Sequence, residues 1–244
     1  MQSLALAPAA VVDRSLQQVS LLLARCFYLL AVCKTERYVF MRYNKPFHIG
    51  TDLDDSCWTV LGQAVRVAQS IGLHVEHEDL QSRICRGRLE DERRRRVWYS
   101  IYVLDRVLAL QLGRPPAIHD DDYDVPLPSR ISDSDIDWNS DLLIEDRGSS
   151  EGDYFVEVIA FSGIISRVLR SLYGPRRRGI TTEGLISTHN LDLQLIEWKL
   201  KLPRTLRFDL GHAFENSYIY KRQVRPGSFI QPFIVAHWYG MTAD

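Results

Sequence analysis

The 244-residue sequence has few cysteines and no excess of either charge. The cysteines stand at positions 26, 33, 57 and 85, at gaps too wide and irregular for the paired ligands of a structural zinc site. Four cysteines are also too few for a disulfide scaffold, so we predict reduced thiols and no cofactor in this chain. The 30 basic and 31 acidic side chains nearly cancel. The overall charge therefore gives no reason to expect attraction to nucleic acid or to an anionic membrane.

Long hydrophobic runs and catalytic signatures are missing as well. The most apolar stretch, residues 19–32, contains Arg25 and is shorter than the roughly 20 residues that span a bilayer. Residues 1–12 lack the basic side chains that open a secretory signal, so we expect neither export nor a membrane partner. The sequence offers no glycine-rich phosphate loop and no glycine-serine-glycine elbow. We predict that the chain is not an enzyme.

The sequence does contain helical periodicity, with apolar residues recurring at steps of three and four. This spacing predicts helices over residues 15–35, 52–71, 89–112, 154–172, 182–202 and 229–238. Strand-like alternation is nowhere sustained. We therefore predict an all-α fold, with a single multi-helix domain over residues 15–244 after a poorly ordered segment, residues 1–14. Residues 115–153 are acidic and punctuated by prolines, which predicts an exposed, irregular connector.

Three glycines have expected structural roles. Gly72 and Gly113 follow the last periodic residues of two helices, where a left-handed cap favours glycine. Gly62, together with Ala64, is expected to let a neighbouring helix approach closely. Gly113 also opens an elbow that ends at Pro116.

One carboxylate on an apolar stripe needs a partner. Asp105 follows Leu104 on the apolar face of the predicted helix 89–112, where a lone charge would be costly to bury. We expect an arginine such as Arg66 or Arg114 to pair with it.

Two sequence blocks resemble the fungal-specific transcription factor domain. The first runs from the tryptophan of WTVLGQAVRVAQSIGL to the histidine that follows it, and the second from the arginine run to the Val-Pro-Leu-Pro segment. The matching residues are Trp58, Gly62, Arg66, Gly72, Leu73, His74, Glu92, Arg94, Arg95, Trp98, Asp105, Arg106, Gly113, Arg114, Pro115 and Pro128. A weaker leucine, tryptophan, leucine-proline element follows at residues 195–206.

The resemblance implies a regulatory domain that carries out no reaction and works in the nucleus. It also implies a small-molecule inducer, a co-regulator protein or a second copy of the chain as partner. In this family DNA is read by an N-terminal cluster of six cysteines that holds two zinc ions. None of the cysteines here fits that cluster, so we expect zinc and DNA contact to belong to a reader missing from these residues.

The leading rival interpretation is a magnesium-dependent helical enzyme. Asp120, Asp121 and Asp124 have the spacing with which helical terpene synthases hold magnesium against a diphosphate. In those enzymes the carboxylates lie on a helix wall, whereas here prolines enclose the run within a loop. We therefore favour a solvated acidic loop.

Two further patterns have plain structural readings. The run Arg93–Arg96 resembles a phosphate-binding patch, but residues 90–92 are acidic and lie four positions earlier, where they can pair along a helix. His74 and His77 could hold a metal only with a third ligand from elsewhere. A capping or surface histidine is the interpretation we prefer.

Overall fold

The computed structural model describes residues 16–30, 52–76, 88–131, 151–172, 182–203 and 206. Within them every regular element of secondary structure is a helix, which confirms the all-α prediction. The helices are residues 16–30, α2 (Asp52–Ser70), α4 (Arg88–Leu112), α5 (Glu151–Leu172) and α6 (Thr182–Lys201). Residues 1–14 and the predicted helix 229–238 lie outside the described residues. Among the helices described, none has the length and apolar character needed to cross a membrane.

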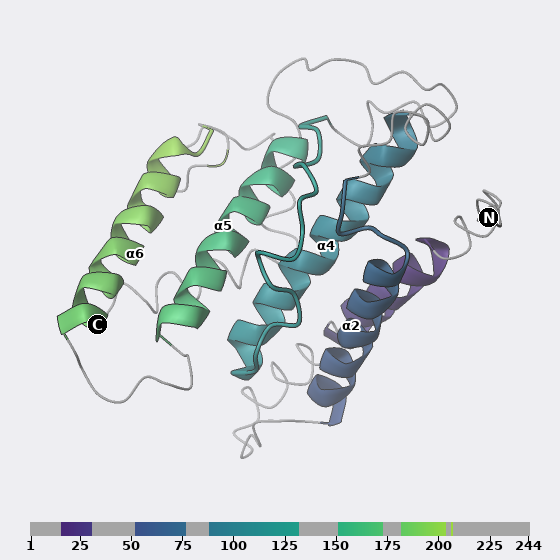
Figure 1. Cartoon of the computed structure of the whole chain (residues 1–244), viewed down its shortest axis with the longest axis horizontal. Helices are drawn as coiled ribbons and strands as arrows, with labels where there is room; N and C mark the ends of the chain where they lie inside the picture. Colours follow the sequence, from purple (N-terminus) through teal and green to yellow (C-terminus); the bar gives the residue numbers. More distant parts are fainter. Residues whose placement is uncertain are drawn as a thin grey trace, which may run out of the picture. The chain divides into compact units, whose positions relative to one another are not determined.

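The chain divides into two units, Met1–Leu200 and Lys201–Asp244. All contacts given below lie within the first unit. There, α4 lies between α2 and α5 and contacts both (Figure 1). Because it has neighbours on two sides, α4 buries side chains around much of its circumference, including Trp98, Tyr102 and Leu108.

Apolar contacts join α4, α5 and α6 in series. Ala109 of α4 packs with Ile165 and Leu169 of α5. On another face of α5, Ile164 and Val168 pack with residues of α6; the partners are Leu191, Leu195 and Trp198. Both sides of α5 are therefore covered, as its high content of isoleucine and valine suggests.

The predicted start of α5 at Tyr154 is wrong by three residues. The helix begins at Glu151 and so takes in Asp153, which had been assigned to the acidic connector. Negative charge is favoured in the first turn of a helix, where it meets the positive end of the helix dipole. Acidic residues here mark a helix start and not the end of a loop.

Two expectations about α2 are also wrong. Steps of three and four place Trp58 on one helix face with Leu61 and Val65, but it is 38% exposed, and the guanidinium of Arg114 lies 5.0 Å from its ring centre. Gly62 was expected to allow a close helix approach, yet a Cβ built there meets no atom within 4 Å. The residues that bury α2 are Cys57, Val60, Leu61, Ala64, Val65 and Ala68.

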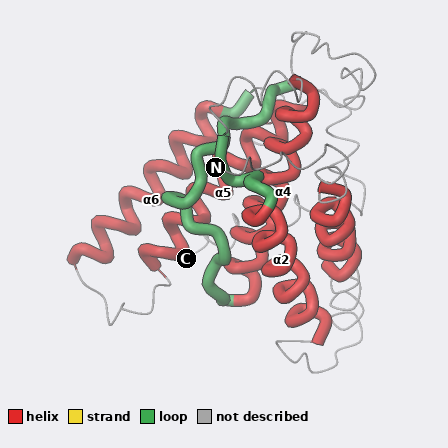
Figure 2. Tube along the Cα trace, turned by 45° about the vertical axis from the view of Figure 1, so that its right-hand side comes forward, coloured by secondary structure: helices red, strands yellow, loops and turns green. Residues whose placement is uncertain are grey.

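Residues 113–131 correct the prediction of an exposed connector. The segment is irregular, as predicted (Figure 2), but Ile118 is 1% exposed and Val125 is 8% exposed. Its buried backbone donors and acceptors need partners, and α4 supplies them. The Tyr99 hydroxyl, for example, donates to the carbonyl oxygen of Val125 at 2.6 Å. Residues 132–150 of the predicted connector lie outside the described part of the chain.

Gly113, at the end of α4, and Gly62, inside α2, allow a matched pair of substitutions. Gly113 has φ +65° and a Cβ there would meet nothing within 4 Å, so alanine would be penalised by backbone strain alone. We expect Gly113→Ala to lower the free energy of unfolding by about 1–2 kcal/mol. Gly62→Ala should raise it by about 0.5–1 kcal/mol, because Gly62 lies in open space inside a helix. Urea denaturation of both variants measures the two signs; a loss of stability in both would contradict this account of α2.

Candidate functional site

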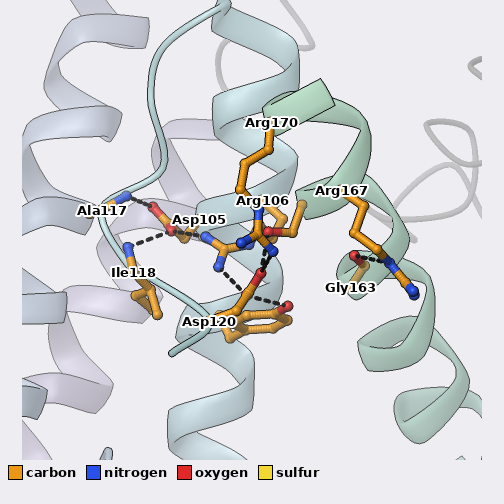
Figure 3. A network of polar contacts seen from close by, with 10 residues as sticks. Asp105, Arg106, Ala117, Ile118, Asp120, Gly163, Arg167 and Arg170 are labelled. Atoms are coloured by element: carbon orange, nitrogen blue, oxygen red, sulfur yellow. Dashed lines mark hydrogen bonds and ion pairs between the residues drawn. The ribbon is translucent and has the colours of Figure 1, made fainter. Parts of the chain in front are cut away.

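A network of charged side chains, which we call the Arg106 network, links α4 to the 113–131 segment and α5. It comprises Tyr102, Asp105, Arg106, Asp120, Ser166 and Arg170. The side chain of Arg106 is 1% exposed and that of Asp105 is 4% exposed. Figure 3 shows the Arg106 guanidinium between the carboxylates of Asp105 and Asp120. Its nitrogens donate to these carboxylates at 2.7 Å each.

Asp105 holds the turn that follows α4. Its carboxylate oxygens accept the backbone N–H groups of Ala117 at 2.9 Å and Ile118 at 3.0 Å. Without these bonds, the N–H groups at the start of an irregular segment would be buried and unsatisfied. The Asp105 side chain therefore fixes the path of the chain beyond Gly113.

Asp120 joins three parts of the chain. One carboxylate oxygen accepts Arg106 at 2.7 Å and the Tyr102 hydroxyl at 3.1 Å, both from α4. The other accepts the Ser166 hydroxyl at 2.6 Å and a guanidinium nitrogen of Arg170, both from α5. Asp120 thus ties the 113–131 segment to both helices.

Burial and pairing move the pKa values of the two carboxyl groups in opposite directions. Burial raises the pKa of Asp105, and the amides of Ala117 and Ile118 oppose this. For Asp120, which is less buried, hydrogen bonds from Ser166 and Arg106 outweigh desolvation and lower the pKa. The buried Arg106 keeps its charge because Asp120 and Asp105 raise its pKa against the cost of desolvation.

Two further tyrosine rings, those of Tyr99 and Tyr123, pack against Tyr102 of this network. The Tyr123 ring lies 5.5 Å from the Tyr102 ring and 6.3 Å from the Tyr99 ring, both in edge-on contact. Burial raises the pKa of Tyr99 to about 12 and also raises the pKa of Tyr102. Both phenols are therefore neutral at physiological pH and act as hydrogen-bond donors.

A second cluster, the Glu92 clamp, fixes the far end of the same segment. Glu92 is 2% exposed and accepts both the N–H and the hydroxyl of Ser129, at 2.9 and 2.7 Å. It also accepts Arg96 Nε at 2.8 Å, and Arg96 in turn donates to the carbonyl oxygen of Ile131. The Glu92 clamp consists of Glu92, Arg96, Ser129 and Ile131.

The other arginines of the run Arg93–Arg96 also have partners. Arg93 lies 3.5 Å from Glu90. Arg94 donates to the carbonyl oxygens of Ile71 and Gly72 at the end of α2. Arg95 pairs with Glu76 at 3.1 Å. These contacts support the structural interpretation of the run over a phosphate-binding patch.

The expected partners of Asp105 are wrong. Arg114 pairs with Asp55, and Arg66 donates to Gln69 at 2.9 Å. The partner is Arg106, the next residue in the chain, although adjacent residues of a helix normally point in different directions. The arginine side chain is long enough to lie between Asp105 and Asp120, so both carboxylates share it.

The acidic run behaves in two ways. Asp121 and Asp122 are exposed, in agreement with a solvated loop. Asp124 accepts the N–H of Glu76 at 2.8 Å, and its own N–H donates to the carbonyl oxygen of His74. The prediction of a solvated carboxylate is wrong for Asp120, whose side chain is 21% exposed and whose two oxygens are bonded to α4 and α5. The three carboxylates therefore do not converge on one metal position.

The remaining motif residues lie in structural positions. Leu73 is 2% exposed, and the ring centre of His74 lies 6.0 Å from that of Trp98. Pro115 is exposed and Pro128 is buried. The described residues contain no group of three or more potential metal ligands, and His77 lies outside them.

A groove of about 420 Å³ lies between α5 and α6. It is lined by Arg167, Ser171, Ile186, Ser187, Asn190, Leu191 and Gln194. Figure 3 shows that Arg167 points away from Asp120, toward the carbonyl oxygen of Gly163, at 3.4 Å. The Gln194 side-chain oxygen is buried without a hydrogen-bond partner in the described structure.

The helical fold thus contains two clusters in which buried charged side chains pair with other groups of the same chain. Residues 46–199 match the family model of the fungal specific transcription factor domain. The match covers more than half of the chain. The chain therefore belongs to the fungal-specific transcription factor domain family, and the resemblance of the sequence blocks is confirmed.

Known relatives are transcription factors. Over 159 residues, 65% of this chain, it is 32% identical to an ABC-transporter-regulating transcription factor of Aspergillus fumigatus, of which it covers 17%. It is 29% identical over 160 residues to Activator of stress genes 1 of Saccharomyces cerevisiae, covering 62% of this chain and 15% of that protein. The chain thus spans a small part of the relatives it matches. No solved structure matches it.

Sequence reasoning missed Tyr102, Ser129, Ser166 and Arg170. Single polar residues on predicted helices or loops carry no spacing signal, and each acts here through contacts far away in the sequence. The signal in the sequence was Asp105 alone, a carboxylate on an apolar stripe, which indicated a buried ion pair but not its partner.

Proposed function

We propose that this chain is the regulatory, non-catalytic part of a nuclear protein that controls transcription. The observation that carries the proposal is the family match over residues 46–199. The use of the motif residues supports it, because Glu92, Arg94 and Asp105 bond to the protein itself. A motif that builds a scaffold fits a domain that works through its shape and surface.

A reporter assay tests the regulatory role. Residues 1–244 are fused between a heterologous DNA-binding domain and an activation domain in a fungal host, and reporter output is compared with the fusion that lacks them. We expect a several-fold change in output, which Arg106→Met should weaken because it destabilises the domain. Equal output with and without the chain would contradict a regulatory role.

We also propose that the partner is a small molecule, a co-regulator protein or a second copy of the chain. The groove between α5 and α6 favours the small molecule, since its volume is within the range of ligand sites. Arg167 and the buried oxygen of Gln194 suit a ligand with a carboxylate and a hydrogen-bond donor. A thermal-shift screen of small organic acids, with Arg167→Ala as the matched variant, tests this.

The rival enzyme proposal has a direct test. Magnesium and a diphosphate added together in a calorimetric titration should give no binding heat, because the lone pairs of Asp120 are taken by Arg106, Arg170, Ser166 and Tyr102. Saturable heat that Asp120→Asn removes would favour the enzyme.

We predict that residues 1–244 alone have no sequence-specific affinity for DNA. The basic run Arg93–Arg96 makes contacts within the protein, so any binding should come from other phosphate contacts and fall steeply as salt rises. Fluorescence anisotropy with candidate and scrambled duplexes at two salt concentrations measures this. A preference of about 10³-fold, typical of specific readers, would show that the domain reads DNA itself.

A further inference from the structure

Two cysteines meet where the helix 16–30 contacts α2. Cys26 and Cys57 are 31 positions apart in the chain, and both are 0% exposed. The sulfur of Cys57 lies 3.6 Å from the carbonyl oxygen of Cys26, and the sulfur of Cys26 lies 3.9 Å from the carbonyl oxygen of Cys57. Each side chain thus reaches the backbone of the other residue. These reciprocal contacts place the two cysteine side chains next to each other.

Helical spacing explains why the two cysteines meet. Cys26 shares the buried face of its helix with Leu23 and Leu30, and Cys57 begins the buried face of α2 that continues at Leu61. Both cysteines are thiols and neither is in a disulfide. A buried cysteine is often only a small apolar residue, but that role does not require two of them in mutual contact.

The chemistry of Cys26 suits a nucleophile. A hydrogen bond from the Cys57 thiol lowers the pKa of Cys26, burial opposes this, and the positive charge of Arg25 lowers the pKa further. The thiolate is the form of cysteine that attacks peroxides and disulfides. Cys26 therefore has an activating neighbour in Cys57. Because both thiols are buried, a peroxide reaches them only when the helix 16–30 opens from α2.

We propose that Cys26 and Cys57 form a reversible intrachain disulfide when the protein meets hydrogen peroxide. The Cys26 thiolate attacks one peroxide oxygen, the O–O bond breaks, and Cys26 becomes a sulfenic acid while the other oxygen takes up a proton and leaves as water. The Cys57 sulfur then attacks the Cys26 sulfur, the S–O bond breaks, and the hydroxide leaves as a second water with the Cys57 proton. Two thiols and one hydrogen peroxide give one disulfide and two waters.

This modification would add a redox input to the regulatory role. The disulfide would join the helix 16–30 covalently to α2, which itself contacts α4. A crosslink that closes a loop restricts the unfolded chain more than the folded one. The oxidised protein should therefore hold its N-terminal helix more firmly than the reduced protein does.

The test uses the whole 244-residue chain with Cys33→Ala and Cys85→Ala, so that Cys26 and Cys57 are the only thiols. The reduced protein is exposed to hydrogen peroxide, quenched, denatured, alkylated and mapped by mass spectrometry. We expect a linked pair of peptides containing Cys26 and Cys57, with two hydrogens lost per chain, that dithiothreitol separates. The thermal midpoint should rise by roughly 5–10 °C on oxidation and return on reduction.

The matched control is Cys26→Ser in the same background, which should form no intrachain link and show no rise in midpoint. The proposal is overturned if peroxide leaves both thiols open to alkylation, links separate chains, or stops at sulfinic acid. If the background variant does not fold, the same mapping on the unmodified chain decides the question, because a link between Cys26 and Cys57 supports the proposal and any other pairing refutes it.

Discussion

Replacing Arg106 with methionine is expected to lower the free energy of unfolding by about 3–5 kcal/mol, the usual cost of removing one partner from a buried ion pair. Methionine can fill much of the apolar volume of the arginine side chain, so the loss reports the charge and not a cavity. The carboxylate of Asp105, 4% exposed, and that of Asp120 would face each other without the guanidinium between them. Chemical denaturation followed by circular dichroism measures the change.

The matched control is Arg170→Met, which removes the other guanidinium on Asp120. Arg170 is 56% exposed, so solvent screens its ion pair and we expect a cost of at most about 1 kcal/mol. Similar losses in the two variants would show that burial of Arg106 contributes nothing special.

The Arg106→Met variant should also depend on pH in a defined direction. Burial already raises the pKa of Asp105, and loss of the neighbouring positive charge must raise it further. In the window between the unfolded and folded pKa values, the folded state then binds more protons than the unfolded state, so stability falls as pH rises. The deficit relative to the original protein should be smaller at about pH 5 than at about pH 8. A deficit that grows on acidification would contradict the assignment.

The helices could be predicted from the sequence because their signals are local. Steps of three and four placed α2 and α4 correctly, and the left-handed conformations of Gly72 and Gly113, with φ 69° and 65°, agree with the predicted helix ends. The start of α5 was misplaced because acidic residues favour both an exposed loop and the first turn of a helix.

The candidate site could be predicted only in part, because its contacts are not local. That Asp105 is buried and paired follows from its place on an apolar stripe. The choice of Arg106 as partner depends on Asp120, which returns to α4 only through the irregular path of the 113–131 segment. Burial of that segment was missed for the same reason, since proline and charge describe its composition but not what covers it.

Glu92→Ala is expected to cost about 3 kcal/mol and to loosen the end of the 113–131 segment. The variant leaves the N–H of Ser129 and the Nε of Arg96 without their acceptor in a site where Glu92 is 2% exposed. Glu90→Ala is the matched control on the same helix: its ion pair with Arg93 is more exposed, so we expect a cost of at most about 1 kcal/mol. Chemical denaturation measures both costs, and hydrogen exchange should show faster exchange at Ser129 in the Glu92 variant alone. Equal costs, or unchanged exchange at Ser129, would mean that the Glu92 clamp does not hold the segment and that the contacts of Asp105 and Asp120 are sufficient to fix it.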